Sequence, residues 1–169
     1  MKSGAIATVA AAALLAMTMQ TSAQTSGEAD TLTEQDIPRA VAALMRCEPS
    51  GAMTRRAFSG GFVFAQTCAG KDEARQRLVY ATDRAGSNAH LLKFHRPEGR
   101  RVSALGNVTF AAEQNEIAGD TGRLSRRICR AEGRWRMEGK MPEPALVYWR
   151  QTRDCEGKTG WQVMVVRKR

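Results

Sequence analysis

The sequence predicts a mainly β (or α+β) fold, in which antiparallel strands follow one N-terminal helix and two disulfides fix the chain. Three observations support this prediction. After Gly60, short runs of β-branched and aromatic residues alternate with turn residues. Before Gly60, one segment carries apolar residues at helical spacing. Four cysteines occur in a chain whose first residues are typical of a secretion leader.

The first residues have the three parts of a signal peptide. Met1–Ser3 carries one positive charge, and an apolar run follows from Ala5 to Met17. This run of about 13 residues is shorter than the roughly 20 that span a bilayer, which argues against a membrane anchor. Thr21-Ser22-Ala23 supplies small residues where a signal peptidase reads them. We expect residues 1–23 to be a signal peptide cleaved after Ala23, and a periplasmic or secreted mature chain without a transmembrane segment.

Residues 24–32 are polar and small, so we expect a flexible lead-in, and we expect residues 33–169 to form a single β-rich domain. The domain should open with a helix that Thr33 or Asp36 can cap, with Pro38 in its first turn. The helix should end near Arg46–Cys47, ahead of a turn signal. Its apolar stripe, which should pack on a sheet, consists of Ile37, Val41, Leu44 and Met45.

The rest of the domain should consist of short strands. Their spacing of about 10 to 15 residues favours antiparallel connections over crossover helices. The expected strands are Phe62–Thr67, Arg77–Thr82, His90–His95, Val102–Phe110, Ile128–Ala131, Arg134–Glu138, Leu146–Thr152 and Trp161–Arg167.

The four cysteines predict two disulfides, because an even number in a secreted chain is typical of a disulfide framework. The cysteines are Cys47, Cys68, Cys129 and Cys155, and three pairings are open. The most local one joins Cys47 to Cys68 and Cys129 to Cys155, and each bond would then stabilise the fold by roughly 3 kcal/mol. The sequence has no C-x-x-C motif that would indicate a redox or zinc site.

The positive charge is concentrated near the C-terminus. The net charge is +9, yet Gln24–Gly122 holds 12 basic and 12 acidic residues, whereas Arg123–Arg169 holds 13 basic against 5 acidic. In Arg134–Glu138 the residues alternate, so Trp135 and Met137 should face the core while the arginines face outward. If neighbouring strands carry the arginines of this region, the arginines form a basic patch that would attract an anion. The predicted anion-binding patch consists of Arg126, Arg127, Arg130, Arg134, Arg136 and Arg150. The alternative is an ordinary solvated strand face.

Catalysis has no support in the sequence. His90 and His95 would point to opposite faces of one strand, so they should not share a metal or a substrate. Asp120-Thr121-Gly122 matches the aspartic-protease tripeptide, but it occurs once and its flanks are polar, so we expect a turn. We expect no catalytic, cofactor or metal site and no enzyme. No nucleic-acid-binding motif is recognisable, so specific nucleic-acid readout is not expected either.

One resemblance adds to this interpretation. The C-terminal part of the chain contains, in this order, a strand ending in Phe110, then Gly122-Arg123, Cys129, the Trp135–Gly139 hairpin and Cys155-Glu156-Gly157 with Trp161. This order resembles a family of secreted proteobacterial proteins of unknown function. The chain departs from that pattern at Ile128 and Arg130, which stand where the family has Asp and Gly. The resemblance implies a Cys129–Cys155 disulfide, and it brings no catalytic residues and no substrate.

The sequence therefore predicts a periplasmic, disulfide-stabilised binding protein with a basic C-terminal surface for an anionic ligand, envelope surface or acidic protein. A hypothesis from another class is a small secreted inhibitor of a hydrolase such as a protease or lysozyme. Its contact loop would be Gly139–Pro144, stiffened by Pro142 and Pro144. Because lysozymes are basic, an acidic target would suit this basic chain better.

Overall fold

The computed structural model describes residues 28–70, 73–123 and 127–166. The predicted signal peptide lies outside these residues, as do residues 24–27 of the predicted lead-in. Within them the chain is mainly antiparallel β-structure with one short α-helix and two disulfides, which confirms the predicted fold class.

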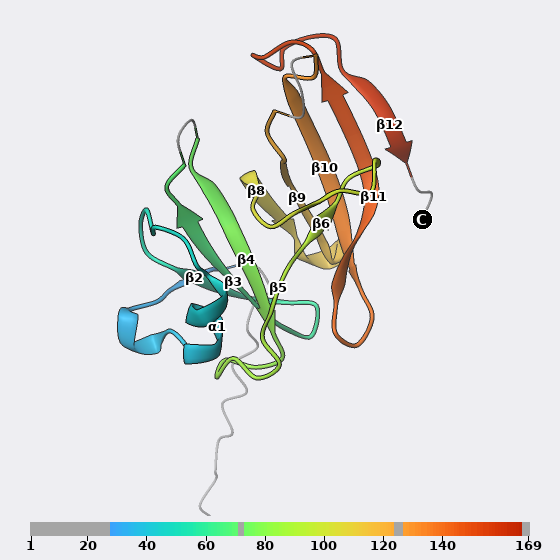
Figure 1. The fold of residues 1–169 in the computed structure, drawn as a ribbon. Helices are drawn as coiled ribbons and strands as arrows, with labels where there is room; N and C mark the ends of the chain where they lie inside the picture. The colour runs from blue at the N-terminus through green and yellow to red at the C-terminus, as the bar shows by residue number, and fades with distance from the viewer. Residues whose placement is uncertain (1–27, 71–72, 124–126, 167–169) are drawn as a thin grey trace, which may run out of the picture.

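The first half of the chain forms the N-terminal sheet, five antiparallel strands paired in sequence order (Figure 1). These strands are β1 (Asp30–Thr31), β2 (Thr54–Phe58), β3 (Gly61–Cys68), β4 (Arg75–Ala81) and β5 (His90–Leu91). Because β1 pairs with Thr54 and Arg55, the ordered domain begins within the segment expected to be a lead-in. Leu32, which follows β1, is buried.

The second half repeats this arrangement as the C-terminal sheet, again a meander in sequence order. Its strands are β8 (Gly106–Ala111), β9 (Glu116–Asp120), β10 (Arg130–Glu138), β11 (Glu143–Thr152) and β12 (Gln162–Val166), and a 3-10 turn (Ala112–Gln114) links the first two. A two-stranded hairpin of β6 (Phe94–His95) and β7 (Arg101–Val102) connects the two sheets.

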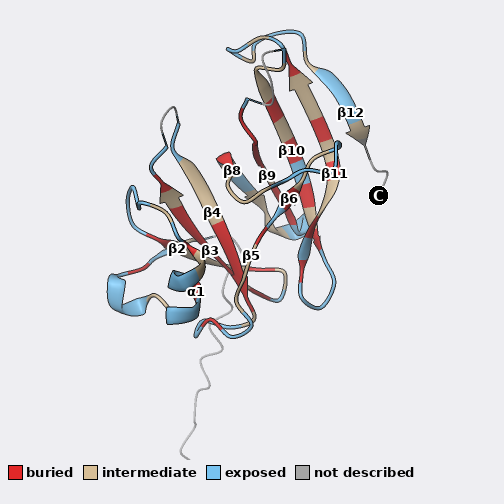
Figure 2. Cartoon of the chain, viewed as in Figure 1, coloured by how far each residue is buried: buried red, intermediate tan, exposed pale blue. Residues whose placement is uncertain are grey.

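The main core lies between the two five-stranded sheets, where Figure 2 shows buried residues along the facing strands. Trp135 and Trp149 are fully buried, with ring centroids 6.4 Å apart, and Phe94 packs edge-on against Trp135 at 5.0 Å. Side chains from both sheets share this cluster, because each strand turns every second residue inward. Backbone hydrogen bonds between Gln76 and Leu105 also join the sheets at one corner.

A second, smaller core lies on the other face of the N-terminal sheet, beneath helix α1 (Arg39–Leu44). Val41 and Met45 are buried there, and Ile37 and Leu44 pack against the cluster, which confirms the predicted apolar stripe. The predicted helix boundaries were wrong. A 3-10 turn (Glu34–Asp36) comes first, and Ile37 is extended before α1 begins after Pro38. The ring of a proline excludes the helical conformation from the residue before it, so the helix cannot run through Ile37.

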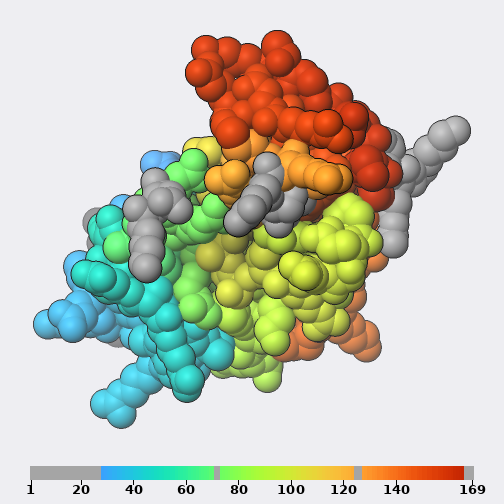
Figure 3. Space-filling view, turned by 45° about the horizontal axis from the view of Figure 1, so that its top comes forward, coloured from blue at the N-terminus to red at the C-terminus, as the bar shows by residue number. Residues whose placement is uncertain are grey.

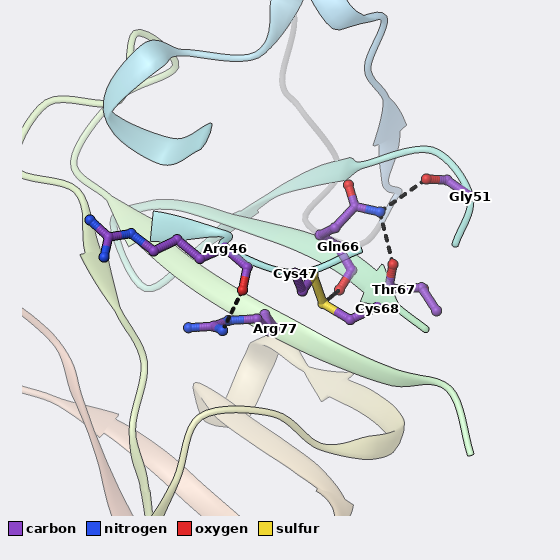
Figure 4. The surroundings of a disulfide bond; sticks show 7 residues. All are labelled: Arg46, Cys47, Gly51, Gln66, Thr67, Cys68 and Arg77. Carbon is purple, nitrogen blue, oxygen red and sulfur yellow. Dashed lines mark hydrogen bonds between the residues drawn. A yellow bond between two sulfur atoms is a disulfide. The ribbon is translucent and has the colours of Figure 1, made fainter. Parts of the chain in front are cut away.

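Both disulfides follow the local pairing, Cys47–Cys68 and Cys129–Cys155. Figure 4 shows the first one, which ties the segment after α1 to the end of β3. The Gln66 side-chain amide donates hydrogen bonds to the carbonyl oxygens of Gly51 and Thr67 beside it, and Arg77 donates to the carbonyl oxygen of Arg46. The helix is therefore attached to the sheet by a covalent bond as well as by its apolar stripe.

Several strand predictions need correction. The predicted strands His90–His95 and Val102–Phe110 are each broken, into β5 and β6 and into β7 and β8. The end of the predicted strand Ile128–Ala131 and the whole of Arg134–Glu138 belong to the single strand β10, which begins at Arg130. Strands β1, β2 and β9 were not predicted. The other expected strands match β3, β4, β11 and β12 within a few residues at each end. In Figure 3 the N-terminal residues lie at one end of the molecule and the C-terminal strands at the opposite end.

Candidate functional site

The outer face of the C-terminal sheet is the face turned away from the main core, and it carries the arginines of β10 and β11. Trp135 is fully buried and Met137 nearly so, whereas the Arg134 side chain is 49% exposed. This alternation confirms the predicted orientation of the strand. Arg130, Arg134 and Arg136 share the outer face because even numbers of positions, four and two, separate them along the strand.

The strand register brings Arg150 to the same face. Glu132 pairs with Arg150 of β11 on one side and with Asp120 of β9 on the other, and Arg134 stands between Tyr148 and Ala118 in the next row. Four arginines of the predicted patch therefore meet on one surface. Arg126 lies outside the described residues. Arg127 is exposed before β10, at a separate pocket beside the end of the sheet.

The four arginines lie among carboxylates, two of which come from β9. The buried Glu116 accepts a hydrogen bond of 2.7 Å from Arg136 and lies 3.9 Å from Arg134. At the other end of β9, Asp120 accepts one of 2.9 Å from Arg130. Four guanidinium charges therefore face three carboxylates, counting Glu132, so these seven groups together carry a net charge of +1.

Glu132 is the third carboxylate and connects two arginines within the sheet. Its Oε2 accepts hydrogen bonds from Nε and Nη2 of Arg150, at 2.9 and 2.5 Å, and its Oε1 lies 3.5 Å from Arg130. The two bonds from Arg150 fix the plane of its guanidinium group. Because these groups are partly exposed, we assign each pair only about 0.2–1 kcal/mol of stability. Their main effect is to orient the arginine heads.

Aromatic rings hold two of these arginines in place. The Arg134 guanidinium lies 4.7 Å from the centroid of the Tyr148 ring, and the Arg150 guanidinium lies 4.2 Å from that of Trp161. Trp161 is fixed in turn, because its indole N–H donates a 2.7 Å hydrogen bond to the carbonyl oxygen of Gly157. Such cation–π contacts contribute about 0.5–1 kcal/mol at exposed sites. Both guanidinium groups are thus oriented without any ligand.

A shallow depression of about 420 Å³ opens between these two arginines. Ala118, the cross-strand partner of Arg134, lines it, and its short side chain leaves space over the sheet. Asn107 and Thr109 of β8 line one side and Tyr148 the other, and the walls expose more carbon than polar atoms. The charged side chains that line this open, mostly apolar hollow are Arg134 and Arg150 and the carboxylates of Asp120 and Glu132, so it can take a ligand that offers both an anionic group and hydrogen-bond donors.

A tight loop after β11 positions Trp161. The Asp154 carboxylate accepts hydrogen bonds from the backbone N–H groups of Glu156, Lys158 and Thr159 and from the Thr159 hydroxyl. These bonds, led by those from the backbone of Thr159 and Glu156, lower the pKa of Asp154 from its ordinary value. The Cys129–Cys155 disulfide anchors the same loop to the start of β10.

The two histidines do not form a shared site, and each of them makes a hydrogen-bonding contact within the fold. His90 lies in β5 and His95 in β6, so they do not share a strand. The Nε2 atom of His90 lies 3.2 Å from the carbonyl oxygen of Pro142, and the backbone carbonyl of His95 accepts a 2.7 Å hydrogen bond from the Trp135 indole. In the part of the chain that the structure describes, no three His, Cys, Asp or Glu residues are grouped to hold a metal.

Asp120-Thr121-Gly122 forms a buried turn at the end of β9. The Asp120 carboxylate accepts hydrogen bonds from the backbone N–H of Gly122 and from Arg130, so it holds the turn and an arginine together. Gly122 has a positive φ of 74°, and a Cβ there would overlap the Arg75 guanidinium. The positive φ is the reason for glycine at this position, because the Arg75 guanidinium is the end of a flexible side chain and can shift away from a Cβ.

The hairpin between β10 and β11 contains the loop expected of an inhibitor. Pro142 and Pro144 are buried, so neither is available to a partner, whereas Met141 at the tip is 44% exposed. The His90 ring contacts this loop at the carbonyl oxygen of Pro142. The prolines thus stabilise the loop from inside.

Comparisons of the chain with protein-family models, curated proteins and solved structures found no match. Membership of the secreted family suggested by the sequence therefore stays a prediction. Among the described residues, no helix is both long and apolar enough to cross a bilayer. The two disulfides are of the kind that persists in oxidising compartments outside the cytoplasm.

Sequence reasoning missed the carboxylates and rings that complete this site. Glu116, Asp120, Tyr148 and Trp161 were not proposed as part of it. In Glu116-Ile117-Ala118-Gly119-Asp120 the residues at both ends are acidic and Ile117 is the core residue, so a strand with acids on one face was a possible signal. Once β9 is recognised, its neighbour in sequence, β10, is the natural partner for these acids.

Proposed function

We propose that this chain is a secreted or periplasmic binding protein that takes an anionic ligand in the depression on the outer face of the C-terminal sheet. The observation that carries this proposal is Arg134, whose half-exposed guanidinium lies against Tyr148 over a hollow next to Ala118. A guanidinium has five N–H donors, and its long 3.9 Å contact with Glu116 leaves donors for a ligand. Signal-peptide cleavage after Ala23 and a family of secreted proteins belong to the same proposal.

The proposal does not include catalysis. The arginines, the carboxylates and Tyr148 are arranged as ion pairs and stacked groups, and none of them forms a nucleophile–base pair. We therefore propose that the protein acts by binding and is not an enzyme.

The test compares two variants that remove one positive charge each. Arg134→Gln changes the proposed site, and Arg39→Gln changes an exposed arginine of α1, which covers the opposite sheet. The probes are dextran sulfate and polygalacturonate, measured by calorimetry at low salt and near 0.15 M. We expect binding that weakens with salt, and a loss of about tenfold in Arg134→Gln only.

Two results would overturn this proposal. One is no binding of either polyanion at low salt. The other is an equal effect of Arg134→Gln and Arg39→Gln on every probe, because the charge would then act from anywhere on the molecule. Thermal unfolding of both variants checks that they fold as the parent does.

The inhibitor hypothesis remains a second candidate because of the exposed Met141 at a braced hairpin tip. An inhibitor should form a stoichiometric complex with a hydrolase that moderate salt hardly affects, because apolar burial is not screened. Met141→Ser should weaken that complex and leave polyanion binding unchanged. Loss of polyanion binding in Met141→Ser would instead contradict the separation of the two surfaces.

A further inference from the structure

The outer face is almost neutral although its arginines are numerous, and this restricts the ligand. Glu116, Asp120 and Glu132 stand among the four arginines, so a ligand lying across the face meets both signs of charge. Like charges repel each other about four times more strongly near a protein surface than in bulk water. A densely charged polyanion would therefore be attracted by the arginines and repelled by the carboxylates.

The polar groups around the depression include acceptors as well as donors. Glu132 offers carboxylate oxygens, and Asn107 and Thr109 offer an amide and a hydroxyl from the exposed surface of β8. A phosphate or sulfate chain has few hydrogens to donate to such groups. A sugar has several hydroxyls, each of which both donates and accepts. The carbon-rich surface near Ala118 and Tyr148 suits the C–H faces of a sugar ring.

From this combination we infer that the ligand is an acidic glycan with about one carboxylate per sugar, a uronic-acid chain. The inference rests on the proposed function and specifies its ligand class. Arg134 receives the sugar carboxylate, because a guanidinium matches that group with two parallel hydrogen bonds. Glu132 accepts a sugar hydroxyl while it holds Arg150. The open sheet face lets a linear chain continue past the depression in both directions.

Replacing Glu132 should change the affinity for the two kinds of ligand in opposite directions. Glu132→Gln keeps the size of the side chain and removes its charge. Binding of dextran sulfate should then tighten severalfold, because a repulsive charge is gone and Arg130 and Arg150 are less neutralised. Binding of polygalacturonate should weaken by about fivefold, because an amide is a weaker acceptor for a hydroxyl than a carboxylate. Glu34→Gln, at an exposed acid of the N-terminal 3-10 turn, is the matched control.

A second experiment measures the affinity of the parent protein for each kind of polymer. Near 0.15 M salt, polygalacturonate should bind more tightly than dextran sulfate of equal chain length. Polygalacturonate whose carboxylates are esterified should lose binding, which separates recognition of the acid from recognition of the sugar. Stronger binding of dextran sulfate, or tightening of both probes in Glu132→Gln, overturns the inference and leaves the proposed anion site intact. An equal response of Arg134→Gln and Arg39→Gln to every probe overturns the proposed function itself.

Discussion

At the scale of single residues, Arg134 and Arg150 owe their positions to aromatic neighbours that the same sheet supplies. Tyr148 is the cross-strand partner of Arg134, and Trp161 lies just before β12, beside Arg150. Free arginine side chains would lose rotamer freedom on binding, at about 0.5–1.5 kcal/mol for each side chain immobilised. Stacking on the rings removes part of this loss before the ligand arrives.

Asp154 gives a prediction about pH. Its pKa is lowered by hydrogen bonds in the folded loop, so its charge stabilises the fold above the ordinary value of 3.8, and that stability is lost as the pH falls through the lowered pKa. Asp154→Asn removes this contribution. The melting temperature of the variant should therefore lie below that of the parent at pH 6, and the gap should close below about pH 3.8.

Thermal unfolding of both proteins between pH 2.5 and 7 measures the gap. A gap of constant size over this range would show that the Asp154 charge does not hold the loop. Glu34→Gln serves as the control, because the Glu34 side chain caps no loop of this kind.

At the scale of elements, β9 supplies two of the carboxylates on the outer face, and it is one of the strands that the sequence did not predict. Propensity explains the failure, since Glu116–Asp120 contains one β-branched residue beside alanine, glycine and two acids. The tertiary context overrides this weakness, because β9 is paired on both sides, with β8 and β10. The orientation of Arg134 and Trp135 was predictable, because alternation is a local property of one strand. The ion pairs of Arg134 and Arg136 were not, because they depend on a neighbouring strand.

The disulfides predict a difference between the two halves of the molecule. They join residues 21 and 26 positions apart, so the chain-entropy model gives each roughly 3 kcal/mol. Replacing either pair by serines should lower the free energy of unfolding by about that amount. Only the pair Cys129→Ser with Cys155→Ser should also weaken anion binding, because that bond anchors the loop before Trp161.

Urea unfolding and calorimetry with polygalacturonate measure both effects. The pair Cys47→Ser with Cys68→Ser is the control for general destabilisation, since it lies beside α1. Equal losses of affinity in the two double variants would contradict the role given to the loop.

At the scale of the whole molecule, the fold changes the meaning of the net charge of +9. Counting along the sequence gives a neutral N-terminal part and a basic C-terminal part, yet Glu116 and Asp120 belong to the former and pair with arginines of the latter. The C-terminal sheet is therefore a nearly neutral surface with oriented ions. Long-range attraction of polyanions depends on net charge, whereas recognition at short range depends on this arrangement.

The two five-stranded sheets also differ in how many of their faces are buried. The N-terminal sheet buries both of its faces, one against the C-terminal sheet and one beneath α1. Among the described residues, no element packs over the outer face of the C-terminal sheet, so that face is open to a ligand at the depression. This asymmetry is the reason for placing the binding site on the second meander.

Chemical-shift mapping tests this placement most directly. The protein, labelled with ¹⁵N, is titrated with an oligomer of galacturonate at 0.15 M salt. We expect the largest amide shifts at Thr109, Ala118, Arg134, Tyr148 and Arg150, and we expect the indole N–H signal of Trp161 to move with them. Shifts concentrated on α1 or on the hairpin tip around Met141, with the outer face unchanged, would contradict this placement.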